Sequence, residues 1–67
     1  MQLIVKKERE KTTEKVFFSK KTLGELLTQL NINPETIIAV RNNIIIIEDE
    51  ELKENETIEL LSVISGG

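Results

Sequence analysis

Residues 22–30 (TLGELLTQL) are the one clear stretch of this 67-residue sequence with the periodicity of an amphipathic α-helix. Thr22 is suited to cap the helix N-terminus, and Glu25 follows it at the spacing of a capping box. We expect the helix to end before Pro34. The predicted apolar stripe consists of four leucines, Leu23, Leu26, Leu27 and Leu30. Because a lone helix must bury such a stripe, the rest of the chain has to provide a single apolar surface for it.

The remaining apolar segments have the pattern of β-strands. Residues 1–7 alternate in polarity and residues 14–19 follow after a charged turn, which predicts a hairpin. Residues 36–47 carry Asn42-Asn43, a pair that tolerates the left-handed backbone of a tight turn, between two aliphatic runs. Residues 57–65 form the last predicted strand. The predicted order is β-β-α-β-β-β, an α+β fold with a mixed sheet and one main helix packed on one face. We expect a domain of residues 1–64 followed by a flexible Ser-Gly-Gly tail of residues 65–67.

Composition excludes several classes of site. The sequence has no cysteine and no histidine, which removes disulfides and the usual structural zinc sites. The acidic run 48–51 lacks the spacing and the glycine of a calcium loop, so no metal site is expected. The chain has no glycine-rich phosphate loop and little room for a deep pocket, and we therefore expect no enzymatic activity of its own. No apolar run approaches the length of a membrane span, which predicts a cytoplasmic protein without a membrane partner.

Charge is distributed unevenly along the chain. Residues 1–21 carry seven basic and three acidic side chains (net +4), whereas residues 22–67 carry two basic and nine acidic side chains (net −7). The basic hairpin raises the possibility of nucleic-acid binding. Its lysines are interrupted by glutamates, few aromatic residues are available for stacking, and the total charge is −3, so direct nucleic-acid binding is not expected. We expect a monomer when the chain is alone.

The sequence ends in Ser65-Gly66-Gly67, directly after the last predicted strand. Glycine lacks a Cβ atom, so a Gly-Gly segment is thin enough to enter a narrow channel in another protein. The α-carboxylate of Gly67 is ionised at neutral pH and is a competent nucleophile towards a phosphoryl group. A frayed chain end is the alternative interpretation. No side chain of this sequence could activate the carboxylate, so a separate enzyme would have to do so.

The order of the elements, the segment VRNNIIIIEDEELKENETIELL and the final SGG together resemble the ThiS/MoaD family of sulfur carriers, which have the ubiquitin-like β-grasp fold. The opening MQLIVK is also similar to the first strand of ubiquitin. The resemblance covers the whole chain. It departs from the family pattern at Asn43, where a glycine usually follows the asparagine of the turn.

The resemblance implies a function for the tail. An E1-like activating enzyme would use ATP to adenylate Gly67, and a sulfur donor would then convert it to a thiocarboxylate. That sulfur would pass to a synthase or thiolase that makes thiamin, molybdopterin or thiolated tRNA. The carrier itself would bind no cofactor. Two alternatives stay open: a ubiquitin-like modifier joined through Gly67 to lysines of target proteins, and a stand-alone binding module whose Gly-Gly ending is incidental.

One face of a sheet that carries a single helix has no cover, so apolar residues on it are candidates for docking a partner. Alternation in the last strand places Leu61 and Val63 opposite Ile58 and Leu60. We expect a docking patch for the activating enzyme made of Leu61 and Val63 with Ala39 and Arg41 of the neighbouring strand. Scattered surface aliphatics are the alternative. Ile4 and Phe17 would extend the patch only if Val16 and Phe18, rather than Phe17, face inward, and the sequence leaves that phase open.

Overall fold

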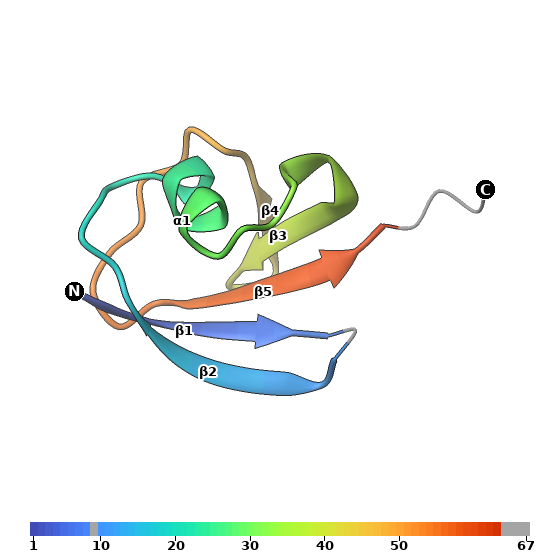
Figure 1. Ribbon diagram of the computed structural model, residues 1–67, viewed down its shortest axis with the longest axis horizontal. Helices are drawn as coiled ribbons and strands as arrows, with labels where there is room; N and C mark the ends of the chain where they lie inside the picture. Colours follow the sequence, from blue (N-terminus) through green and yellow to red (C-terminus); the bar gives the residue numbers. More distant parts are fainter. Residues whose placement is uncertain (9, 64–67) are drawn as a thin grey trace.

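A computed structural model describes residues 1–8 and 10–63 of the chain (Figure 1). Its elements follow the predicted order, with a short 3₁₀ helix, η1, added after the main helix. The bounds are β1 (Gln2–Lys7), β2 (Thr12–Phe17), α1 (Leu23–Gln29), η1 (Pro34–Thr36), β3 (Ile37–Arg41), β4 (Ile44–Ile46) and β5 (Thr57–Ser62). The acidic connector between β4 and β5 forms turns and a single bridge, Thr22 to Glu51.

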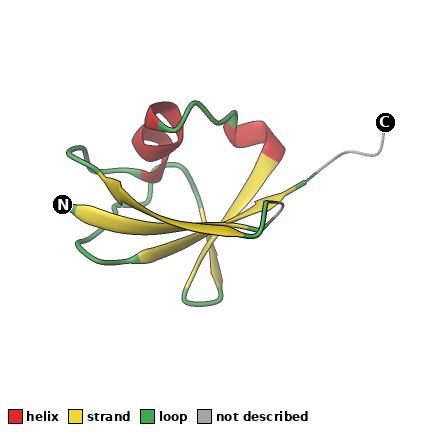
Figure 2. Ribbon diagram, turned by 60° about the horizontal axis from the view of Figure 1, so that its bottom comes forward, coloured by secondary structure: helices red, strands yellow, loops and turns green. Residues whose placement is uncertain are grey.

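The five strands form one mixed sheet in the order β2-β1-β5-β3-β4. β1 and β5 run parallel in the middle of the sheet, and the other three pairings are antiparallel. α1 and η1 lie on the same side of the sheet, and no helix of the described residues covers its other face (Figures 1 and 2). The α+β fold with one main helix on one face of a mixed sheet is therefore confirmed.

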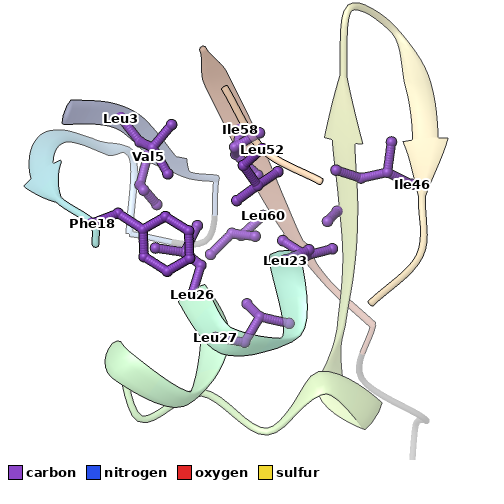
Figure 3. Packing of buried hydrophobic residues seen from close by; sticks show 11 residues of the cluster. Leu3, Val5, Phe18, Leu23, Leu26, Leu27, Ile46, Leu52, Ile58 and Leu60 are labelled. Atoms are coloured by element: carbon purple, nitrogen blue, oxygen red, sulfur yellow. The ribbon is translucent and has the colours of Figure 1, made fainter. Parts of the chain in front are cut away.

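The core lies between α1 and the covered face of the sheet (Figure 3). Leu26 and Leu27 of the predicted stripe are essentially inaccessible to solvent, and Leu30 is half-buried at its edge. The leucine periodicity thus identified the buried face of the helix correctly. Among the described residues, the buried cluster is Leu3, Val5, Phe18, Leu23, Leu26, Leu27, Ala39, Ile46, Leu52, Ile58 and Leu60.

Two sets of hydrogen bonds fix the start of α1, one within its first turn and one with the connector between β4 and β5. The Thr22 hydroxyl accepts a hydrogen bond from the Glu25 backbone N–H at 3.3 Å, and the Glu25 carboxylate accepts one from the Thr22 N–H at 3.1 Å. This is the predicted capping box. The N–H groups of Leu23 and Gly24 donate to carbonyl groups of the connector, at Glu50 and Glu48, both at 2.9 Å. The connector therefore satisfies helix N–H groups that would otherwise lack partners.

The β3–β4 turn has the geometry that the sequence predicts. Asn42 and Asn43 have φ angles of 55° and 64°, and two successive positive values are typical of a type I′ turn. The open question about β2 is also settled. Phe18 is fully buried and Val16 is half-buried against the core, whereas Phe17 is 69% exposed.

Within the described residues, no helix is both long enough and apolar enough to span a bilayer.

Candidate functional site

β5 is the strand that leads to the C-terminal tail, and it occupies the centre of the sheet between β1 and β3. Ile58 and Leu60 are buried beneath α1, so the alternation of the strand turns Glu59 and Leu61 to the open face. Beyond the strand, the Val63 N–H donates to the Thr36 carbonyl group at 2.9 Å, which continues the attachment to the β3 side of the sheet. The predicted site residues Ser65, Gly66 and Gly67 lie outside the described residues.

The strand register identifies the open-face neighbours of Leu61. It lies opposite Ile38 of β3, and Glu59 lies opposite Val40. Ile38, Val40 and Leu61 are half-buried, and Val63 is 46% exposed. We call these four residues, Ile38, Val40, Leu61 and Val63, the tail-side patch. They form an apolar surface at the end of the sheet from which the chain continues towards Gly67.

The prediction that Ala39 belongs to this open surface is wrong. Ala39 is 2% exposed and is paired with Leu60 on one side and with Ile46 on the other, and both partners are core residues. Directly paired residues in a sheet share one face, so Ala39 faces α1. Its small side chain belongs to the packing beneath the helix and is inaccessible to a docked protein.

The predicted open-face position of Arg41 is also wrong. Arg41 follows Ala39 by two residues and therefore shares its face. Its guanidinium contacts the Glu50 carboxylate at 2.6 Å and the Glu56 carboxylate at 3.3 Å, and it donates to the Glu51 carbonyl group at 2.9 Å. The hydrogen bond to Glu50, with the charge of Glu56, raises the pKa of Arg41 further above its usual value. Arg41 thus fastens the acidic connector to β3.

Ile4 and Phe17 are on the open face, yet the register sets them apart from the tail-side patch. Ile4 is paired with Lys15 and Thr57, and Phe17 is paired with Gln2 at the far end of β1. In the next open-face row towards Leu61, Thr13, Lys6 and Glu59 lie side by side, and Val40 of the patch and Ile45 continue the row. Polar and charged residues of β2, β1 and β5 therefore separate Ile4 and Phe17 from Leu61, and Phe17 is remote from the strand end that leads to the tail.

A shallow hollow lies on the covered side, at the point where β5 ends. Among the described residues, its lining consists of Lys7, Glu10, Ile32, Ile37, Leu60 and Ser62. Lys7 and Glu10 approach each other at 3.8 Å across one side of it. The hollow is open, and one partly exposed ion pair borders it.

The acidic connector contributes to the structure through the ion pair of Glu50 with Arg41. Within residues 1–8 and 10–63, no three acidic side chains gather closely enough to hold a metal ion. Glu50 is engaged by Arg41, while Glu48, Asp49 and Glu51 are exposed.

Sequence reasoning missed Ile38 and Val40. The segment Ile37–Val40 is apolar in both strand phases, so alternation alone does not say which residues face α1. The signal that separates them is the pairing of Ala39 with Leu60, and this pairing depends on the register across β5.

Comparison with known proteins agrees with this geometry. The family model described as "ThiS family" matches residues 3–67, a span that begins at the second residue of β1, includes the other four strands and continues through Gly66 and Gly67. A sulfur carrier protein, TtuB from Thermus thermophilus, is 47% identical over 45 residues, which are 67% of this chain and 69% of that protein. The fold, the register of β5 and the match over nearly the whole length lead to one assignment: the chain belongs to the ThiS family of ubiquitin-like β-grasp sulfur carriers.

Proposed function

We propose that this protein carries sulfur as a thiocarboxylate on Gly67 and acts as a co-substrate for other enzymes. The observation that carries the proposal is the extent of the ThiS family match, which continues beyond β5 to Gly67. The similarity to the sulfur carrier protein TtuB supports the same role.

The proposed chemistry begins with the carboxylate of Gly67. One of its oxygens attacks the α-phosphorus of ATP, which forms an acyl adenylate and releases pyrophosphate. A sulfide equivalent from a sulfur donor then attacks the acyl carbon, AMP leaves with the shared oxygen, and a thiocarboxylate remains. An E1-like activating enzyme binds the ATP and supplies the catalysis, so the carrier itself binds no cofactor. The sulfur then passes to an acceptor enzyme, a synthase or a thiolase.

The point at which the chain is attached to the sheet after β5 determines how far the carboxyl group of Gly67 can reach. Val63 is held to Thr36 by its backbone N–H, and four residues follow it. At 3.3–3.6 Å per residue, those four residues span at most about 14 Å. Gly66 and Gly67 carry no Cβ atom, so the last part of this span fits a channel that would exclude larger residues.

We propose that the tail-side patch docks the activating enzyme. The patch is on the face without a helix, and it lies on β5 and the neighbouring β3, just before the reactive tail. A surface that binds the enzyme there would fix the start of the tail while its end enters the active site. The correction of Ala39 and Arg41 changes the membership of the patch and leaves Leu61 and Val63 in it.

A pair of variants on the open face tests the docking proposal. Leu61→Glu places a charge in the tail-side patch, and we expect ATP–pyrophosphate exchange by the activating enzyme to require a much higher carrier concentration. Phe17→Glu places the same charge on the same face, beyond the row that contains Lys6 and Glu59, and we expect normal exchange. Equal exchange by both variants and the wild type would show that the tail-side patch does not dock the activating enzyme.

Intact-mass spectrometry of the protein isolated from its own cells tests the proposed function. A sulfur carrier shows a form in which one oxygen at Gly67 is replaced by sulfur. Conjugates to lysines of other proteins would instead indicate a protein modifier. If neither form is found in cells with active sulfur transfer, the tail has no such chemistry and the chain is a binding module.

A further inference from the structure

β4 forms one edge of the sheet, and it is unusually apolar for an exposed edge. In the order β2-β1-β5-β3-β4, it pairs only with β3 within the described residues. Ile44, Ile45 and Ile47 are 65%, 66% and 67% exposed, whereas Ile46 between them is 8% exposed. The opposite edge, β2, carries Thr12, Thr13, Glu14 and Lys15 in the positions where polar side chains discourage strand pairing. The two edges are therefore protected to very different extents against pairing with a strand of another molecule.

The backbone of Ile45 offers hydrogen-bonding groups at this edge. The two-residue turn at Asn42-Asn43 makes Arg41 and Ile44 the hydrogen-bonded pair that closes the hairpin. Antiparallel pairs alternate between hydrogen-bonded and non-hydrogen-bonded, so the next pair, Val40 and Ile45, does not exchange hydrogen bonds. The N–H and C=O of Ile45 therefore point away from β3, towards the side where another strand would lie.

An apolar groove accompanies this edge on the covered side of the sheet. It runs between α1 and the β3–β4 hairpin, and one end is bordered by Glu48. Its apolar lining includes Leu23, Leu27, Pro34, Ala39, Ile46 and Ile47. A strand added beside β4 would direct every second side chain to this side of the sheet. The groove is placed to receive an aliphatic side chain from such a strand.

The charge around the edge favours a cationic partner. Glu48, Asp49 and Glu51 are exposed directly after the isoleucines, while Glu50 is already paired with Arg41. A basic strand would gain favourable interactions with the exposed carboxylates. A second copy of this chain would bring a further acidic connector to the interface, and its own net charge is −3.

From these observations we propose that β4 binds an extended segment of another protein, in which aliphatic residues alternate with lysine or arginine, as a sixth strand of the sheet. Main-chain hydrogen bonds to Ile45 would give affinity, and the groove and the acidic residues would give selectivity. β4 is separated from β5 by β3, so this partner would not pair with the strand that leads to the tail. The proposal does not depend on the chemistry at Gly67.

A peptide titration of the full-length, ¹⁵N-labelled chain tests the proposal. The probe is a short peptide of alternating lysine and valine. We expect it to shift the amide signal of Ile45 and to slow its hydrogen exchange, and we expect added salt to weaken the binding. A peptide of alternating glutamate and valine should not bind. Nor should the lysine peptide bind after N-methylation of all its backbone amides, because this modification removes the strand donors on both edges and leaves the side chains unchanged.

Two variants at one position separate the backbone contribution from the side chain. Ile45→Pro removes the outward N–H at an edge position where proline is compatible with a strand, and we expect about tenfold weaker binding. Ile45→Thr retains the N–H and the β-branched shape and should bind within about twofold of the wild type. The N-methylated peptide gives the same information if Ile45→Pro destabilises the hairpin.

Four results would overturn the proposal. They are equal binding of the acidic peptide, undiminished binding of the N-methylated peptide, shifts confined to residues around Leu61, and formation of a dimer through β4 at the concentrations of the titration.

Discussion

Leu60 and Leu61 are neighbours in β5 that face opposite sides of the sheet, so truncating each in turn separates stability from docking. Leu60 is 3% exposed beneath α1, and a buried Leu→Ala change costs about 2–5 kcal/mol. At about 0.05–0.15 kcal/mol per residue, a domain of 67 residues has a free energy of unfolding of about 3–10 kcal/mol. Leu60→Ala should therefore remove a large part of the total stability. Leu61 is half-buried on the open face, and Leu61→Ala should cost about 1 kcal/mol.

Urea denaturation followed by circular dichroism measures the first effect, and ATP–pyrophosphate exchange with the activating enzyme measures the second. We expect Leu61→Ala to raise the KM for the carrier about fivefold or more, as truncation of an interface residue worth at least about 1 kcal/mol would do. Leu60→Ala should leave the KM unchanged once it is calculated for the folded fraction. If Leu61→Ala destabilises the fold as much as Leu60→Ala, the assignment of faces in β5 is wrong. If it leaves the KM unchanged, the docking role is wrong.

Three further changes test separate parts of the structure. Arg41→Met should lower the free energy of unfolding by about 1–2 kcal/mol, because Glu50 and Glu56 lose their partner in partly exposed positions. Denaturation at two salt concentrations measures how much of this loss comes from electrostatic attraction that salt screens. Glu25→Gln should change the stability of the protein in acid. Hydrogen bonds from the backbone, first that of Thr22, lower the Glu25 pKa from its usual 4.5. The stability that the Glu25 charge provides is therefore complete above pH 4.5 and is lost as the pH falls through the lower pKa of the folded state. The wild-type advantage over Glu25→Gln in urea midpoints should thus shrink below pH 4.5, and an advantage independent of pH contradicts the capping role. Asn43→Gly should stabilise the protein by about 0.5 kcal/mol in thermal unfolding, because the φ of 64° suits glycine better than asparagine; a loss of stability would contradict the type I′ turn.

Local patterns were sufficient to predict the elements that depend on local interactions. Thr22 and Glu25 are three residues apart and form the capping box, and both ends of that interaction can be read from the sequence. The leucine spacing identified the buried face of α1, and Asn42-Asn43 identified the hairpin turn. In each case the interacting residues are close in sequence, so no knowledge of tertiary pairing was needed.

The tail-side patch could be predicted only in part, because its membership depends on strand register. In β5 the polar Glu59 interrupts the apolar residues and fixes the phase, so Leu61 was placed on the correct face. In β3 no polar residue does this before Arg41, and the prediction that Ala39 and Arg41 lie on the open face was wrong. The carboxylates that satisfy Arg41, on Glu50 and Glu56, are nine and fifteen residues away and reach it only through the path of the connector.

A similar limit applied to β2. The sequence Val16-Phe17-Phe18 is apolar throughout and is therefore compatible with either phase. The structure buries Phe18 and leaves Phe17 exposed, because the pairing of Leu3 with Val16 fixes which residues face α1. The pairing with β1 therefore determines which residues of this segment face the core, and composition alone does not predict it.

The most direct test of the account is to find where sulfur is attached after a reconstituted reaction. The full-length carrier is incubated with its activating enzyme, ATP and sulfide, and tandem mass spectrometry of the C-terminal peptide locates any modification. A variant lacking Gly67 and a variant with one alanine added after it serve as controls. We predict that one oxygen of the Gly67 carboxyl group is replaced by sulfur in the wild type and that neither control is modified. Sulfur on another residue, or a wild-type peptide that stays unmodified while the enzyme consumes ATP with an established carrier, would contradict the central claim.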